Sequence, residues 1–134
     1  MDHARAAELR DAWAARLVEP ATADAHAEVA RLLAERVPEP EAAAAIAEAD
    51  GRRRVAALAG GALYLVWTTP GLPEAVRCRR IPLGPAAVEL SERAGEQHWW
   101  FEIGEEPLVF RALDAADAAF AAALARALGW PSVG

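Results

Sequence analysis

The sequence predicts an α+β domain in which helices precede an antiparallel sheet and one amphipathic helix ends the chain. Three observations predict this class. Apolar residues recur at helical spacing through residues 1–50, the period changes to two near Arg52, and helical spacing returns after Asp114. We therefore expect an N-terminal helical extension over residues 1–51, and six or seven strands with a C-terminal helix over residues 52–134, packed as one compact unit.

Three helices are predicted before the sheet. The first ends at Pro20, and the second begins at the N-cap residue Thr22 and ends before Pro38. A third, short helix is predicted over Glu41 to Ala49, closing near Gly51. The apolar stripes of the first two helices contain Ala6, Leu9, Trp13, Leu17, Ala25, Val29, Leu32 and Leu33.

Six strands with short connections are predicted next, which favours an antiparallel meander. Gly60 and Gly61 are typical of a tight hairpin turn, because glycine adopts positive φ at low cost. The strand around Leu63 to Trp67 is apolar on both faces, so we expect the N-terminal helices to cover its outer face. The predicted strands are 55–59, 62–68, 75–81, 86–93, 98–103 and 108–112.

The C-terminal helix is predicted to begin at Asp114, whose carboxylate can cap the first turn. Asp117 in that turn suits the positive end of the helix dipole. Gly129 and Pro131 end the helix, and its apolar face contains Ala116, Phe120, Leu124 and Leu128.

Composition excludes several functions. All 14 basic residues are arginine, so the chain has no lysine for a Schiff base or a phosphate-binding loop. A net charge of −6 repels phosphate backbones, and nucleic acid is therefore not an expected partner. The single Cys78 is expected to act as a small buried apolar residue. Without a signal-peptide pattern or a membrane-spanning run, we expect a cytoplasmic protein.

Three passages within residues 53–129 form a recognisable set. They are Gly-Ala-Leu-Tyr-Leu-Val-Trp at 61–67, Arg-Cys-Arg-Arg-Ile-Pro-Leu at 77–83, and Leu-Val-Phe at 108–110 before the Asp114 helix. Together they resemble bacterial pleckstrin-homology-like domains. The resemblance implies a barrel of two packed sheets, plugged at one end by the helix, that docks peptides, proteins or lipid head groups without catalysis.

This sequence departs from that family in two ways. Its first hairpin loop, Leu58 to Ala62, has no charge, whereas relatives that bind phosphoinositides carry basic residues there. The family has seven strands and the sequence pattern shows six. Either a strand is hidden near residues 70–76 or the assignment of strands is wrong.

Two arginine clusters are candidate binding residues. Arg53, in the run Arg52-Arg53-Arg54, and Arg77, Arg79 and Arg80 could together bind a phosphate, an anionic membrane surface or an acidic peptide. The interpretation we favour is that they form ion pairs with the acidic N-terminal segment, where residues 1–50 hold 11 of the 20 acidic residues.

Trp99 and Trp100 are consecutive, so a strand sends them to opposite faces and places one of them in the core. The other is either an aromatic anchor for a partner or a residue covered by an N-terminal helix, and we favour coverage. Trp100 and its neighbour His98 are therefore candidate binding residues.

We predict no metal site, no cofactor and no enzymatic activity. His3, His26 and His98 lie far apart, and no Ser, Thr or Cys stands in the setting of a catalytic nucleophile. The sequence thus predicts a non-enzymatic binding or scaffolding module that recognises a protein partner or forms a homo-oligomer. The alternative is peripheral association with an anionic membrane or a phosphate-bearing ligand through the arginine clusters.

Overall fold

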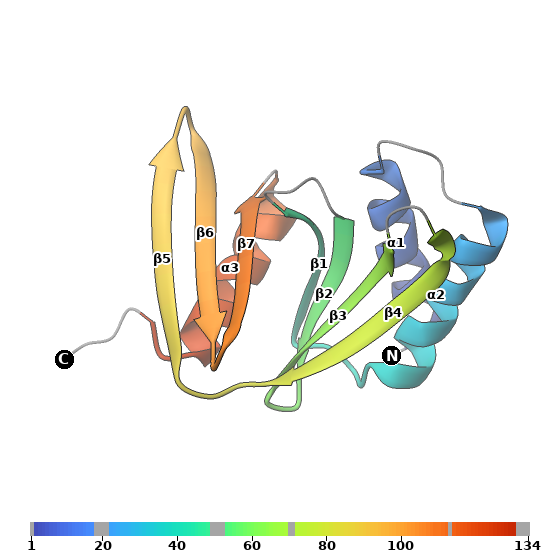
Figure 1. The fold of residues 1–134 in the computed structure, drawn as a ribbon, viewed down its shortest axis with the longest axis horizontal. Coiled ribbons are helices and arrows are strands. Elements are labelled where there is room, and N and C mark those ends of the chain that lie inside the picture. The colour runs from blue at the N-terminus through green and yellow to red at the C-terminus, as the bar shows by residue number, and fades with distance from the viewer. Residues whose placement is uncertain (1, 18–21, 49–52, 70–71, 113, 131–134) are drawn as a thin grey trace.

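The structure is a computed structural model that describes residues 2–17, 22–48, 53–69, 72–112 and 114–130. These residues form an α+β fold with antiparallel strand pairs, which confirms the predicted class. Figure 1 shows the elements. They are α1 (His3–Ala15), α2 (Ala23–Arg36), β1 (Ala42–Glu48), β2 (Arg53–Ala59), β3 (Ala62–Thr69), β4 (Leu72–Pro82), β5 (Ala86–Arg93), β6 (Glu96–Ile103), β7 (Glu106–Ala112) and α3 (Ala115–Ala127).

The strands pair in the order β4-β3-β2-β1-β7-β6-β5. Four strands, β1 to β4, form one half of the sheet, and β5 to β7 form the other. The halves join where β1 meets β7, through the residue pairs Ala47–Arg111 and Glu48–Phe110. The sheet does not close, because β4 and β5 stand at the two ends of this order.

The predicted third helix is wrong, because Ala42–Glu48 forms β1. Six residues of β1 pair with β2, from Ala42 opposite Leu58 to Ala47 opposite Arg53. The strand missing from the sequence pattern therefore lies in this segment, although β4 also begins earlier than predicted, at Leu72. The predicted helical extension thus contributes a strand to the sheet, and its predicted end at Gly51 lies outside the described residues.

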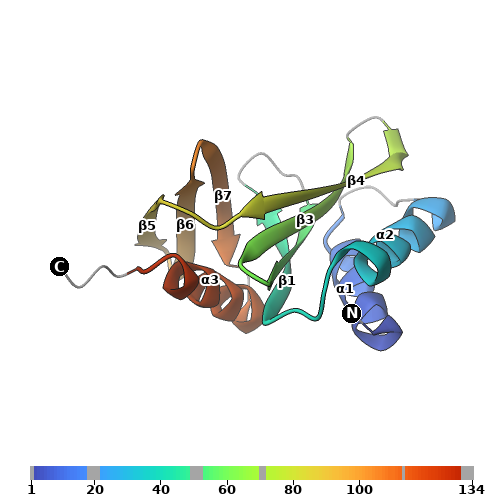
Figure 2. The ribbon, with the colours of Figure 1, turned by 90° about the horizontal axis from the view of Figure 1, so that it is seen from below.

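One face of the sheet, here called the inner face, packs on α3. Ile46, Leu63 and Phe101 are fully buried against Phe120 and Leu124 of the helix. Asp114 caps α3 as predicted, since its carboxylate accepts a hydrogen bond from the backbone N–H of Asp117 at 2.9 Å. Because α3 contacts both β1 and β7, it lies under the junction of the two halves (Figure 2).

The opposite, outer face is covered by α1 and α2 over strands β1 to β4. Trp13 and Leu33 are fully buried there against Val55 and Val66. This arrangement confirms that the N-terminal helices cover the outer face of the apolar strand β3. Figures 1 and 2 both place α1 and α2 at the end of the molecule away from β5, β6 and β7.

Candidate docking surface

Strands β5, β6 and β7 have an outer face on which no helix of the described chain packs. The core that α1 and α2 form draws its strand residues from β1 to β4 alone, within the described part of the chain. We call the outer face of β5 to β7 the open face. Its residues are Ala87, Glu89, Ser91, Arg93, Glu96, His98, Trp100, Glu102, Pro107, Val109 and Arg111.

The register of the strands arranges the open face in rows across β5, β6 and β7. The acidic row takes its name from Glu102 and the basic row from Arg111. The middle row contains the apolar pair Trp100 and Val109 beside Glu89. In order, the acidic row is Ala87, Glu102 and Pro107, the middle row is Glu89, Trp100 and Val109, and the basic row is Ser91, His98 and Arg111.

Trp100 and Val109 make the centre of the open face apolar. They are direct cross-strand partners, so their side chains lie side by side on one face. Val109 is 38% exposed and is the one large hydrophobic residue exposed in the described chain. A surface hollow of about 560 Å³ adjoins them, and His98 and Trp130 also line it.

The predicted coverage of Trp100 by an N-terminal helix is wrong. Trp99 is 3% exposed on the inner face, as expected for one member of the pair, and Trp100 is only partly buried on the other. The helices pack on β1 to β4 because their apolar stripes meet the apolar outer residues of β2 and β3, such as Val55 and Val66. The corresponding outer residues of β5 are Glu89, Ser91 and Arg93, which offer little apolar area to a helix.

Aromatic rings support the open face from beneath. Trp99 stacks on Phe101 with ring centroids 5.5 Å apart, and Phe101 stacks on Phe110 at 5.8 Å. Trp130 meets Trp99 edge to face at 5.5 Å. This layer of packed rings lies on the inner side of the strands that carry Trp100 and Val109.

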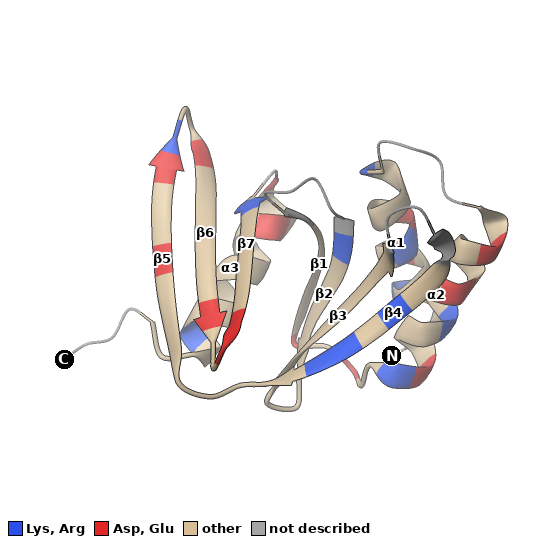
Figure 3. Cartoon of the chain, in the orientation of Figure 1, with Lys and Arg blue, Asp and Glu red and all other residues tan. Residues whose placement is uncertain are grey.

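Charged residues of both signs surround the apolar centre of the open face. Figure 3 shows acidic residues where β6 leads into β7, along β5 and at the start of β6, and basic residues at the ends of β5 and β7. In the basic row, His98 Nε2 and Arg111 lie 3.6 and 3.7 Å from the same Glu96 carboxylate oxygen. The acidic row holds Glu102, which is partly exposed. The open face therefore has Trp100 and Val109 at its centre beside Glu89, with Glu102 toward one end and Arg111 in contact with Glu96 toward the other.

The predicted arginine patch on β4 divides between the two faces of the sheet. Arg77 and Arg79 oppose Trp67 and Leu65 of the inner face, whereas Arg80 opposes Tyr64 of the outer face. Arg79 forms an ion pair with Glu106 of β7, and Arg80 Nε donates to the Tyr64 hydroxyl at 3.3 Å. Among the described residues, no ion pair links Arg77, Arg79 or Arg80 to the N-terminal segment.

The first arginine cluster lies two strands away from β4. Arg53 pairs with Ala47 of β1 through its backbone, and its side chain lies outside the described part of the structure, as does Arg52. The guanidinium of Arg54 lies over the Trp67 ring, 4.6 Å from its centroid. This cation–π contact holds the Arg54 guanidinium against the fold.

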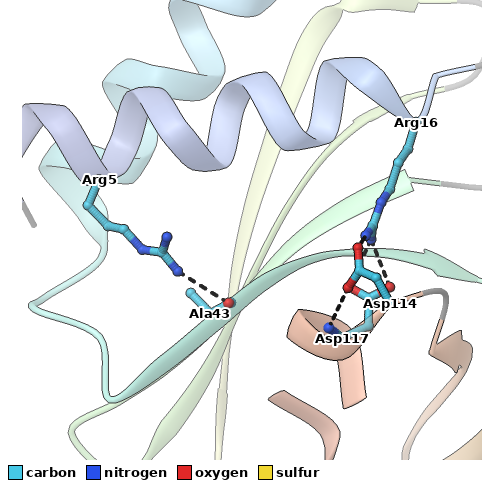
Figure 4. Close-up of polar contacts among 5 residues, drawn as sticks. All are labelled: Arg5, Arg16, Ala43, Asp114 and Asp117. Carbon is cyan, nitrogen blue, oxygen red and sulfur yellow. Dashed lines mark hydrogen bonds and ion pairs between the residues drawn. The ribbon is translucent and has the colours of Figure 1, made fainter. Parts of the chain in front are cut away.

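An ion-pair network joins α1 to α3 (Figure 4). Arg16 Nη1 donates to both carboxylate oxygens of Asp117, at 2.8 and 2.9 Å, and the other terminal nitrogen contacts Asp114. Asp117 is fully buried and the Arg16 side chain is 17% exposed. The Asp117 N–H and then Arg16 hold the pKa of Asp114 below its usual value. This network fixes α1 against the start of α3.

Cys78 lies on β4 and packs against the core beneath α1 and α2. The residue is half-buried, and burial raises the pKa of its thiol. A raised pKa keeps the sulfur protonated at neutral pH and therefore less reactive. Its environment matches the predicted role of a small apolar residue more closely than that of a nucleophile.

Sequence analysis identified Trp100 and His98 of the open face but missed Val109, Arg111 and Glu102. The alternation in Leu108-Val109-Phe110 assigns Val109 to the face away from the core. Its position beside Trp100, however, depends on the register between β6 and β7. The turn Gly104-Glu105, which sets that register, was the available signal.

In the described part of the chain, no helix is long and apolar enough to cross a membrane. The described residues also contain no group of three or more His, Cys, Asp or Glu side chains placed to hold a metal ion. Comparison with family models, curated proteins and solved structures found no match to this chain. The open face and the surrounding fold are therefore the features of this chain that bear on its role.

Proposed function

We propose that this chain is a non-enzymatic protein-binding module and that the open face is its docking surface. The observation that carries the proposal is the Trp100–Val109 pair, which lies on the face of β5 to β7 where no helix of the described chain packs. Tryptophan is enriched among residues that dominate binding energy at protein interfaces. A charged rim around an apolar centre is the usual organisation of such an interface.

The proposed architecture is pleckstrin-homology-like. Support comes from the order β4-β3-β2-β1-β7-β6-β5, the division into four- and three-stranded halves, and the C-terminal helix packed between them. The sequence resemblance implied two packed sheets and a C-terminal helix, and it also implied a barrel, whereas the sheet here does not close. In this proposal α1 and α2 are an addition that covers the four-stranded half and leaves the three-stranded half free to bind.

Anionic membranes or phosphate-bearing ligands are less well supported as partners. Arg79 is paired with Glu106, and Arg80 points to the opposite face from Arg77. A surface that binds phosphates needs several guanidinium groups directed to one side. The open face, by contrast, gathers its apolar and charged residues on one side of three adjacent strands.

Site-specific photo-crosslinking tests the proposal. A benzoylphenylalanine at Val109 should form discrete adducts with protein in cells that express the chain, and the added change Trp100→Ala should abolish them. The control position is Ala119, which is exposed on α3. Adducts with another copy of the chain or with a different protein both support the proposal. Equal adducts at the two positions, or none at Val109, would overturn it.

A further inference from the structure

The open face can pack against the open face of a second copy that is rotated by half a turn. When two copies face each other with their β6 strands antiparallel, each acidic row lies opposite the partner copy's basic row. Glu102 then faces His98 and Arg111 of the other copy, since these lie in adjacent columns of the register. The middle rows meet, so that Trp100 contacts Trp100, Val109 contacts Val109 and Glu89 lies opposite Glu89.

We infer that the occupant of the open face is a second copy of this chain, bound about a two-fold axis that crosses β6 at Trp100. This inference rests on the proposed function and names its partner. A two-fold interface requires a self-complementary patch, because each surface element meets its counterpart in the other copy. The open face meets this condition where Glu102 lies opposite Arg111 of the other copy and where Trp100 and Val109 lie on the axis. Glu89, at the exposed β5 edge of the middle row, lies opposite its own counterpart.

The size of the open face determines how strong the dimer is. The three strands lie about 4.8 Å apart, so the open face is roughly 14 Å wide across the strands. Its residues alternate along each strand and extend over roughly 20 Å. Stable interfaces bury on the order of 800 Å² on each partner, which is more than this patch supplies. The dimer is therefore weak and depends on protein concentration. Trp100 provides most of its binding energy, because it is the largest side chain at the centre.

Sedimentation equilibrium of the full chain over a range of concentrations measures the dimer. Wild type should show reversible dimer formation, and Trp100→Ala should raise the dissociation constant by at least about tenfold. The charge reversals Glu102→Arg and Arg111→Glu should each weaken the dimer, because each one places like charges opposite one another. Arg126→Glu, on the exposed side of α3, is the control and should leave the dissociation constant unchanged.

Combining Glu102→Arg with Arg111→Glu should restore dimer formation to near the wild-type level. Within one chain, Arg111 is four residues along β7 from the partner of Glu102, a separation of about 13 Å. The two side chains therefore do not pair within a chain, and rescue reports contact between copies. Circular dichroism and thermal unfolding of each variant show that the fold persists.

Three results would overturn the inference. They are a chain that stays monomeric at all concentrations, a dimer that Trp100→Ala leaves unchanged, and a double reversal that gives no rescue. A monomeric chain whose Val109 photo-crosslinks to a different protein overturns the dimer and leaves the proposed function intact. A chain that stays monomeric and also forms no crosslink at Val109 would overturn both the dimer and the proposed docking function.

Discussion

Ala94 adopts a backbone conformation that alanine disfavours. Its φ is 51°, and it is the one non-glycine residue of the described chain with positive φ. Ala94 and Gly95, with φ of 81°, form the turn between β5 and β6 at the basic end of the open face. The left-handed region costs an L-residue about 1–2 kcal/mol, whereas Asn-Gly is a preferred pair in such turns.

We predict that Ala94→Asn raises the free energy of unfolding by about 1 kcal/mol, since asparagine tolerates this conformation. Urea denaturation measures the change. Gly60→Ala is the reciprocal control, because Gly60 has φ of 56° in the β2–β3 turn. That change should lower the free energy of unfolding by about 1 kcal/mol. Destabilisation by Ala94→Asn would contradict the assigned turn.

Trp99 and Trp100 show what the sequence predicts about single residues. Alternation along a strand placed them on opposite faces without further information, and the structure confirms this. Whether a helix covers Trp100 depends on how two helices divide their apolar stripes among seven strands. That choice is made by tertiary packing, so sequence periodicity could not decide it.

At the scale of elements, β1 is the largest error in the sequence analysis. Ala42 to Ala45 are strong helix formers, and Pro40 and Gly51 suit the two ends of a helix. Both sides of β1 are buried, since Ala44 and Ile46 face α3 and Ala45 faces α1 and α2. Both sides of the strand are therefore apolar. A strand covered on both faces loses its alternation, and its pairing with β2 and β7 outweighs local propensity.

The Arg16 network makes a quantitative prediction about how α1 is held. Arg16→Met leaves the buried Asp117 without its guanidinium partner and should lower the free energy of unfolding by about 3 kcal/mol. The matched control is Arg10→Met on the same helix, whose partner Asp11 is 70% exposed. That variant should change stability by less than about 1 kcal/mol, because solvent screens the pair. Urea denaturation at neutral pH measures both.

Acid stability is a second readout of this network. The pKa of Asp114 is lowered in the folded chain, so its stabilising contribution is complete above its unfolded pKa and disappears as pH falls through the folded value. Arg16 is one cause of the lowered pKa. The loss of stability between neutral and acidic pH should therefore be smaller in Arg16→Met than in wild type. Equal losses would show that Arg16 does not hold Asp114 in solution.

At the scale of the whole molecule, the two halves of the sheet differ in what covers them. The inner faces of both halves share α3, whereas α1 and α2 cover the outer face of β1 to β4. Sequence analysis predicted the α+β class, the antiparallel pairing and the covering role of the helices. It could not predict which half stays open, because that depends on strand order and register over long separations.

Hydroxyl-radical footprinting at low protein concentration tests the central claim, that the outer face of β5 to β7 is open, most directly. Trp99 and Trp100 are chain neighbours, so each is an internal control for the other. The structure predicts that Trp100 is oxidised much faster than Trp99 and Trp13, which are 3% and 0% exposed. Oxidation of Trp100 as slow as that of Trp99 would show that this face is covered and would contradict the account.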